Sequence, residues 1–321
     1  MIILNEIFFL VFAFLTVFLS IKLSYYADSL SKHSKVSKAL IGGIVLAGVT
    51  SLPEFITSFS ALLIGNNLLA MGDVLGSNIF NIFMVCVFDI IFMKKMMFTY
   101  TSKRHNLVIG LLIINYIVLY FFVSKMISFS IFKIGIPTLV IIFSYLFYLK
   151  ATCKEEKEEV YINEEGYTKS LVLKLIGTAI LMIVASGLLT IVVNNLAILH
   201  PAFSSSFLGA IFLGVTTSLP EVVTFYALFS LKSYDLALAN ILGSNLFNLL
   251  VLAVCDLVTL GSSIYGLADK DTVFIVFIGL LFSVICFFLN IRKNVKSTFS
   301  YVWLSGIVVL IYLGFWIAKF I

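Results

Sequence analysis

The sequence predicts an all-α membrane protein whose ten transmembrane helices form two inverted five-helix repeats. Three observations lead to this fold class: the composition, the length of the apolar runs and an internal repeat. Of 321 residues, 61% are hydrophobic and 12% are charged, with a mean hydropathy of +1.15. A soluble domain is about half apolar and about a quarter charged, so this composition excludes one. It also excludes a disordered chain, which has few apolar residues and much charge.

Apolar runs recur along the whole chain, and a membrane-spanning helix needs about 20 mainly apolar residues. The first run lacks the basic start of a signal peptide and is long enough to span, so we expect it to remain as a helix. Ten runs meet this criterion and are expected to span at residues 2–23, 38–64, 68–93, 105–124, 127–149, 170–193, 204–231, 235–260, 271–290 and 299–320.

The widest interruption lies between residues 150 and 169 and carries the charged run Lys154–Glu159. Its composition is that of a solvated loop. It divides the chain into a first five-helix repeat at 1–149, a linker loop at 150–169 and a second five-helix repeat at 170–321.

The positions of the basic residues predict the orientation, because Lys and Arg concentrate in cytoplasmic loops. We expect both termini outside, since this choice places nearly all of the 21 basic residues, and the linker, in the cytoplasm. The exceptions, in segments that then face outward, are Lys125, Lys133, Lys270 and Lys319.

Two polar sequence blocks occur twice, at one common offset of 167 residues. Thr50–Glu54 (TSLPE) recurs as Thr217–Glu221, and Gly76–Asn81 (GSNIFN) recurs as Gly243–Asn248 (GSNLFN). Since each half contains an odd number of spans, the two halves must enter the membrane in opposite directions. Inverted repeats are typical of secondary transporters, which bind their substrates near the midplane where the halves meet.

The first block of each pair places an acid and hydroxyl groups in an apolar span. Thr50, Ser51 and Glu54 share one helical face, because they are spaced by three and four residues. Pro53 removes a backbone donor, and the carbonyl groups that this frees are tolerated at membrane depth only beside protein, water or an ion. A lone proline is usually only a kink, but a charge at membrane depth costs at least about 2.5 kcal/mol, and here the cluster is duplicated.

The second block adds a hydroxyl and an amide, Ser77 and Asn81, which are four residues apart. The other half offers the equivalent side chains Thr217, Ser218, Glu221, Ser244 and Asn248. Together these residues predict an oxygen-lined site with two carboxylates and no soft ligand, which suits a hard cation such as Ca²⁺. Two glutamates balance one divalent ion or, in part, several monovalent ions, and this is the physical basis for exchange.

At these residues the sequence resembles the sodium/calcium exchangers of the cation/calcium antiporter superfamily. Their two α-repeats carry a G-T-S-L-P-E-like motif and a G-S-N-x-x-N-like motif, which read here GVTSLPE with GSNIFN and GVTTSLPE with GSNLFN. The resemblance implies an antiporter that moves Ca²⁺ against Na⁺ across the plasma membrane by alternating access. It implies neither an enzyme nor a cofactor, and it makes the first and sixth spans a pair that slides against the other eight.

The same resemblance assigns roles to individual residues. Glu54 and Glu221 correspond to the central acidic ligands, and Asn81 and Asn248 to the amides beside them. The hydroxyl or carbonyl ligands correspond to Thr50, Ser51, Ser77, Thr217, Ser218 and Ser244.

The chain departs from the family pattern in three places. The glycine usual before Thr-Ser is Val49 in one half and Thr216 in the other, and Asn248 stands where some members carry Asp. Asp73 stands where Asn is usual, and its counterpart is Asn240. Asp73 lies one turn before Ser77, so it is a candidate ligand for a second cation or a proton, or a cap of a broken helix.

Two further acids, Asp89 and Asp256, each lie eight residues past a site asparagine, which is about 12 Å along a helix. They are too far away to bind the same ion. They either reach the membrane interface or take part in an ion or proton relay.

Other classes of function receive less support from the sequence. An antiporter of the same fold coupled to H⁺ or K⁺ is the alternative, followed by a passive cation channel. An enzyme has no nucleophile–base pair, P-loop or HExxH motif to support it. We expect Ca²⁺ and Na⁺ as substrates, the lipid bilayer as surroundings, no nucleic acid, and a monomer as the simplest assembly. The histidines His33, His105 and His200 are expected to be solvated in loops.

Overall fold

The computed structural model describes residues 2–31, 50–126, 130–131, 134–153, 169–259, 263–292 and 297–320. This part of the chain is helical apart from one short antiparallel hairpin, β1 (Ser130–Ile131) and β2 (Ile134–Gly135). The long helices are α1 (Ile2–Ser31), α4 (Asn67–Ile91), α5 (His105–Val123), α6 (Ile136–Cys153), α7 (Lys169–Leu199), α9 (Gly214–Ser230), α10 (Tyr234–Val258), α11 (Lys270–Ile291) and α12 (Thr298–Phe320). The shorter ones are α3 (Leu52–Leu63), α8 (Ser205–Leu208), the 3₁₀ turns η2 (Met93–Lys95), η3 (Met97–Thr99) and η5 (Ile264–Leu267), and the π-helical turn η4 (Gly209–Leu213).

Eight helical segments of the described chain are long and apolar enough to cross a membrane, and α3 and α6 are shorter apolar helices. These are the helices of a multi-pass membrane protein, as the composition predicts. The expected span at 38–64 is described only from residue 50 onward, and its first part lies outside the described residues. The count of ten spans therefore stays a prediction.

One predicted span begins later than expected. The apolar run at 127–149 was expected to be helical throughout, but α6 begins at Ile136, after the β1–β2 hairpin. Pro137 lies in the first turn of α6, where its missing N–H would have no helical partner and its fixed φ favours helix initiation. The proline therefore sets the start of this helix, and hydropathy alone did not detect it.

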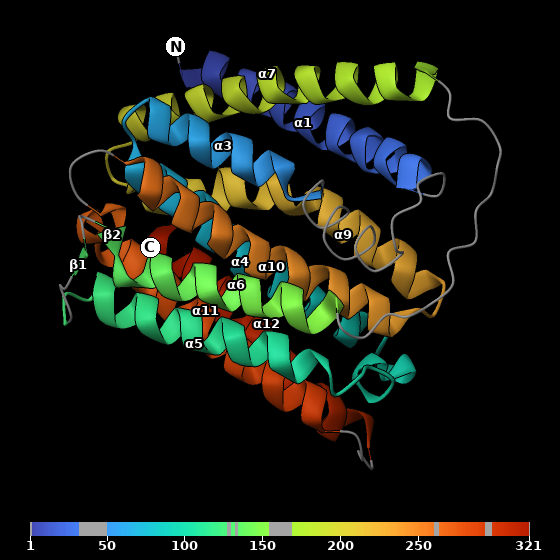
Figure 1. Cartoon of the computed structure of the whole chain (residues 1–321). Coiled ribbons are helices and arrows are strands. Elements are labelled where there is room, and N and C mark those ends of the chain that lie inside the picture. Colours follow the sequence, from blue (N-terminus) through green and yellow to red (C-terminus); the bar gives the residue numbers. More distant parts are fainter. Residues whose placement is uncertain are drawn as a thin grey trace.

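The helices lie in layers, with α1 and α7 together on one side of the molecule and α5, α6, α11 and α12 on the opposite side (Figure 1). Between these layers lie α3, α4, α9 and α10, and every pair of these four helices is in contact. The two duplicated sequence blocks fall on these four helices. The fold thus brings both copies of each block to the centre of the molecule.

Glycines let the central helices approach at backbone distance. A Cβ added at Gly72 would lie 2.1 Å from the carbonyl oxygen of Ser206, and one added at Gly76 would lie 2.2 Å from the Cα of Ala210. From the other side, a Cβ on Gly214 would lie 2.7 Å from the backbone nitrogen of Ser77. Small residues at helix interfaces allow this approach in membranes, where helices associate by close packing.

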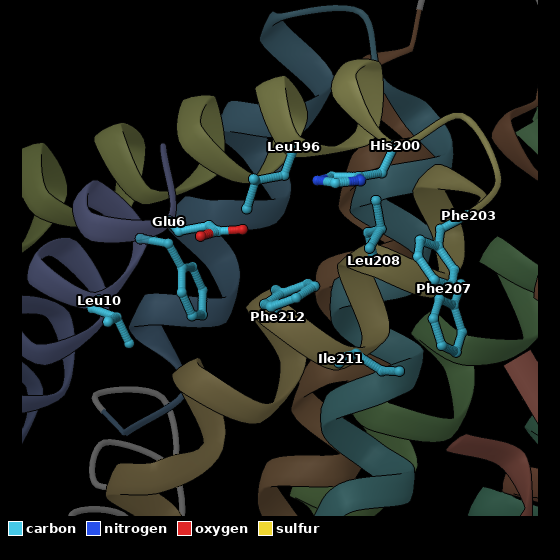
Figure 2. A pocket seen from close by; sticks show the side chains of 10 residues that line it. Glu6, Leu10, Leu196, His200, Phe203, Phe207, Leu208, Ile211 and Phe212 are labelled. Carbon is cyan, nitrogen blue, oxygen red and sulfur yellow. The ribbon is translucent and has the colours of Figure 1, made fainter. Parts of the chain in front are cut away.

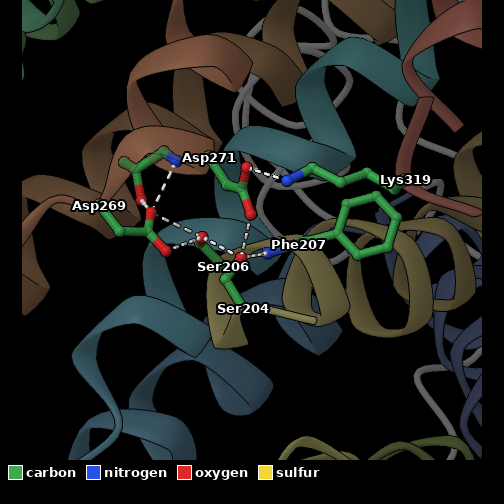
Figure 3. A network of polar contacts seen from close by, with 7 residues as sticks. Ser204, Ser206, Phe207, Asp269, Asp271 and Lys319 are labelled. Atoms are coloured by element: carbon green, nitrogen blue, oxygen red, sulfur yellow. Dashed lines mark hydrogen bonds and ion pairs between the residues drawn. The ribbon is translucent and has the colours of Figure 1, made fainter. Parts of the chain in front are cut away.

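A polar network fixes the beginning of α8 against α11 and α12 (Figure 3). Ser206 Oγ donates to both carboxylate oxygens of Asp269 at 2.8 Å, and Ser204 Oγ donates to Asp271 Oδ2 at 2.5 Å. Lys319 of α12 forms an ion pair with Asp271. These contacts hold the α8–η4 segment in the position where the α4 glycines meet it.

Candidate functional site

The two TSLPE blocks begin differently in the two halves. In the first half, Pro53 lies in the first turn of α3, which begins at Leu52. In the second half, Pro220 lies inside α9. A proline inside a helix removes the hydrogen bond to the carbonyl four residues earlier, so the carbonyl of Thr216 loses its helical donor. Of the two helices, only α9 therefore contains an interior proline that frees a backbone carbonyl, as the sequence predicted.

The two glutamates at the centre are bound crosswise by serines of the opposite half. Ser218 Oγ donates to Glu54 Oε1, and Ser51 Oγ donates to Glu221 Oε1, both at 3.2 Å. All four side chains are fully buried. The sequence predicted that these residues would meet, and the structure brings them together across the interface between α3 and α9.

The second carboxylate oxygen of each glutamate has no partner among the described residues. Glu54 Oε2 and Glu221 Oε2 are buried without a hydrogen bond to that part of the chain. Among the described residues, no Lys, Arg or His forms an ion pair with either of them. Buried charges are normally paired with another charge or bind a metal ion. The two glutamates are therefore candidate ligands for a cation.

The hydroxyl groups around the glutamates are buried as well. Ser77 Oγ donates to the carbonyl of Gly214 at 3.2 Å and lies 3.4 Å from Thr217 Oγ1, so α4 and α9 meet at these side chains. Ser244 Oγ is buried without a partner, and Thr50 is fully buried. Ser77 and Thr217 therefore meet across the two halves, whereas Ser244 and Thr50 are shown to be buried and remain predicted ligands.

Four buried asparagines join α4 to α10, two of which the sequence analysis left without a role. Asn78 Nδ2 donates to the carbonyl of Asn245 at 3.0 Å, and Asn245 Nδ2 donates to the carbonyl of Asn78 at 3.1 Å. Their side-chain oxygens accept from the predicted site amides, Asn248 Nδ2 at 3.1 Å and Asn81 Nδ2 at 2.9 Å. Asn78 and Asn245 belong to the duplicated GSN block and have the same offset, so this repeat was the signal that could have identified them.

Asp73 lies beside the glutamates but has its own partners. Its Oδ2 accepts from Ser58 Oγ at 2.7 Å and from Thr57 Oγ1, while its Oδ1 is buried without a partner. Among the described residues, no group of three or more His, Cys, Asp and Glu side chains is placed to hold one metal ion. Asp73 is thus adjacent to the paired glutamates and does not form a three-acid cluster with them. Thr57 and Ser58 carried no motif signal.

Asp89 and Asp256 are both buried inside the protein, at 1% and 2% exposure. Asp89 accepts from the hydroxyls of Tyr301 and Ser305 on α12, at 2.5 and 2.6 Å. The oxygens of Asp256 accept from the backbone N–H groups of Gly135 and Ile264 and from Thr138 Oγ1. Each carboxylate oxygen thus accepts at least one hydrogen bond from another helix, turn or strand, and the relay stays a prediction.

One histidine also differs from expectation. His105 is 9% exposed, and its Nε2 lies 2.7 Å from Asp235 Oδ1 in the first turn of α10. It joins the beginnings of α5 and α10 and is not a free solvated side chain. His200 is partly buried, and His33 lies outside the described residues.

The chemistry of the centre follows from its unpaired oxygens. Six buried oxygens without a partner come from the predicted site residues: Glu54 Oε2, Glu221 Oε2, Asp73 Oδ1, Ser244 Oγ, Asn81 Oδ1 and Asn248 Oδ1. Hard cations such as Ca²⁺ take six to eight oxygen ligands, with carboxylates and amide carbonyls among them. These oxygens are of the types that such an ion binds, and within the described chain Asp73 lies outside any three-acid cluster with the two glutamates.

Comparison with known proteins supports this interpretation. Residues 6–152 and 170–321 match the family model described as "Sodium/calcium exchanger protein". The inner membrane protein YrbG of Escherichia coli (strain K12) is 27% identical over 284 residues, which cover 85% of each chain.

Two solved structures have a similar fold. The H⁺/Ca²⁺ exchanger CAX has a TM-score of 0.67 at 14% identity and covers 98% of this chain and 88% of its own. The sodium-calcium exchanger NCX_Mj has a TM-score of 0.57 at 20% identity and covers 98% of both chains. Because the family model matches both halves, the chain belongs to the sodium/calcium exchanger protein family of cation antiporters.

Proposed function

We propose that this protein is a secondary active antiporter that exchanges Ca²⁺ for Na⁺ by alternating access at a midplane site. One observation carries the proposal: Glu54 and Glu221 are buried together, each is bound by a serine of the other half, and each keeps one oxygen unpaired. Such a pair suits a bound cation, which would neutralise it. The ligands we assign are the eleven predicted residues: Thr50, Ser51, Glu54, Asp73, Ser77, Asn81, Thr217, Ser218, Glu221, Ser244 and Asn248.

The charge of the pair supports exchange rather than one-way movement. One Ca²⁺ neutralises two carboxylates, and Na⁺ ions compensate the same charges in its place. An empty site with both glutamates ionised would leave two negative charges at membrane depth, where each costs at least about 2.5 kcal/mol. This cost disfavours the change of accessible face when the ionised site is empty, and it thereby couples the movements of the two ions.

Coupling to H⁺ or K⁺ is the alternative, and the same glutamate pair would serve it. The similar structures include one described as an H⁺/Ca²⁺ exchanger and one soaked with Na⁺. Asp73, with its unpaired Oδ1, offers a third buried negative charge beside the pair. The acidic side chains offer ligands or proton acceptors to Na⁺, K⁺ and H⁺ alike, so flux measurements must identify the coupling ion.

The architecture we propose is two inverted five-helix repeats, at 1–149 and 170–321, joined by a cytoplasmic linker at 150–169, with both termini outside the plasma membrane. The helices α1 and α7 form the sliding pair. They lie side by side at one face of the molecule (Figure 1). A cavity of about 350 Å³ lies between part of this pair and α8 and η4, lined mainly by apolar side chains such as Leu10, Phe207 and Phe212 (Figure 2). Apolar side chains beside an unfilled cavity suit an interface along which helices move.

Flux measurements test the proposal. The purified protein is placed in liposomes loaded with Na⁺, K⁺ or acidic buffer in separate samples, and uptake of radiolabelled Ca²⁺ is followed. We expect uptake only with internal Na⁺. Uptake driven by K⁺ or by a pH gradient alone would identify K⁺ or H⁺ as the coupling ion in place of Na⁺. Uptake without any counter-ion would indicate a channel.

Substitution of the glutamates links this flux to the site. Glu54→Gln and Glu221→Gln keep the size of the side chain and remove the charge, so each is expected to reduce uptake to the level of protein-free liposomes. Asp235→Asn is the matched control, because Asp235 is exposed in the first turn of α10 and contacts His105, away from the glutamates. Normal exchange in both site variants would refute the assignment.

A further inference from the structure

The orientation of the two site amides is determined by a chain of hydrogen bonds that begins at backbone carbonyls. A carbonyl can only accept, so the atom of Asn78 that faces the carbonyl of Asn245 must be its NH₂ group. The side-chain oxygen of Asn78 then points to Asn248 and must receive the NH₂ group of that residue. The oxygen of Asn248 is left on the other side, buried and unpaired.

The mirrored half repeats this order. The NH₂ group of Asn245 faces the carbonyl of Asn78, and its oxygen accepts from the NH₂ group of Asn81. The oxygen of Asn81 is again left unpaired. Asn81 follows Ser77 by one turn, so its side chain leaves α4 on the same face as Ser77, which meets α9.

This order matters because an asparagine presents either an acceptor or a donor, depending on how its amide is turned. With NH₂ toward the centre, Asn81 or Asn248 would repel a cation and offer it no lone pair. The two orientations of an asparagine amide, with its oxygen and NH₂ group exchanged, have nearly the same shape, so packing alone does not select between them. The selection comes from the fixed carbonyl acceptors of α4 and α10.

We propose that Asn78 and Asn245 are positioning residues that adapt the site to cations, by holding Asn248 and Asn81 with their oxygen atoms toward the ion. The inference rests on the proposed function. All four amides are at most 2% exposed, so water does not compete for these bonds. Partners that orient metal ligands in this way typically change metal affinity by about 10–100-fold when they are removed.

Calcium binding to the purified full-length protein tests the proposal, with titration calorimetry to give the dissociation constant and thermal unfolding to report the fold. Asn78→Ala and Asn245→Ala are each expected to weaken Ca²⁺ binding by about tenfold. The matched control is Asn115→Ala, which removes another buried amide that accepts from Ser144 Oγ at 3.1 Å. It is expected to leave Ca²⁺ affinity unchanged.

A double substitution separates orientation from packing. Asp in place of Asn248 presents an oxygen however it is turned, so it needs no orienting partner. The carboxylate cannot donate to Asn78 Oδ1 as the NH₂ group of Asn248 does. In the Asn248→Asp background, Asn78→Ala is therefore expected to cause no further loss of affinity, while Asn245→Ala still weakens binding because Asn81 is unchanged. The mirrored expectation holds in the Asn81→Asp background.

An equal loss from Asn78→Ala in both backgrounds would overturn the proposal, because it would show a role in packing only. Unchanged affinity in both single alanine variants would overturn it as well. If the unsubstituted protein binds no Ca²⁺, the proposed function fails along with this inference. If it binds Ca²⁺ while the alanine variants bind equally well, only this inference fails.

Discussion

Asp89 and Asp256 occupy equivalent positions in the two halves and make equivalent hydrogen bonds between helices. Asp89, near the end of α4, binds Tyr301 and Ser305 at the beginning of α12. Asp256, near the end of α10, binds Gly135 and Thr138 at the beginning of α6. Each carboxylate thus ties a central helix of one half to the last helix of the other. A buried charge that accepts several hydrogen bonds stabilises the arrangement of its donors.

We predict that Asp89→Asn lowers stability without removing ion binding. Hydrogen bonds to a charged group contribute about 1.5–3 kcal/mol, and the amide keeps only one acceptor oxygen for the two hydroxyls. The midpoint of thermal unfolding should fall, while the dissociation constant for Ca²⁺ stays within about threefold, since Asp89 lies about 12 Å along α4 from Asn81. Asp256→Asn should behave in the same way. Complete loss of Ca²⁺ binding by a folded Asp89→Asn protein would mean that this acid belongs to the ion site.

At the scale of the helix, the contact between α4 and the α8–η4–α9 segment positions the site. Glycines on both sides allow backbone to meet backbone, and the network around Asp269 and Asp271 fixes the start of α8. Ser77 and Thr217 can meet at 3.4 Å only because these helices are so close. The π-helical turn η4 lies directly before α9, and it shifts the register of the α9 residues that follow.

We predict that Gly76→Ala impairs both folding and transport. Its Cβ would lie 2.2 Å from the Cα of Ala210, so one backbone must move, at a cost of about 1–3 kcal/mol or more. Gly110→Ala is the matched control, because a Cβ at Gly110 meets nothing within 4 Å. Thermal unfolding and Ca²⁺ uptake should both decline for Gly76→Ala and stay normal for Gly110→Ala. If Gly76→Ala kept normal stability and uptake, close approach at this crossing would not be required.

At the scale of the whole molecule, alternating access requires that one group of helices moves relative to another. The pair α1 and α7 is a suitable moving group, because it lies at one face and the cavity shown in Figure 2 lies beside it. Direct polar contacts between this pair and the rest are few among those described. One is the bond from Thr190 Oγ1 of α7 to the carbonyl of Thr57 on α3, at 3.2 Å.

We predict that a disulfide between α3 and α7 stops transport. A Cβ at Gly187 would lie 3.7 Å from Ser60 Oγ, so cysteines at these two positions should form a disulfide under oxidation. Oxidation of the Ser60→Cys, Gly187→Cys protein should abolish Ca²⁺ uptake, reduction should restore it, and Ca²⁺ binding should persist.

The single cysteine variants are the controls for this experiment, because Cys86, Cys255 and Cys286 are buried and free. They should transport normally under oxidation. Normal uptake by a fully cross-linked protein would show that α7 does not slide against α3.

The sequence by itself determined the class of protein, the family resemblance and the residues of the central pair. Hydropathy reports burial in lipid directly, and a duplicated TSLPE block with a buried Glu54 and Glu221 has few explanations other than a shared site. These signals are local in the chain, so they can be read without coordinates.

Only the tertiary structure decided which atoms of these residues are free and which are occupied. The sequence could not show that Asp89 and Asp256 accept hydrogen bonds from other helices, or that Asp73 is held by Thr57 and Ser58. It also assigned Asn78 and Asn245 no role, since the spacing within the GSN block does not show which amide faces which carbonyl. These partners lie on different elements and meet only where the elements cross, and no local pattern records those crossings.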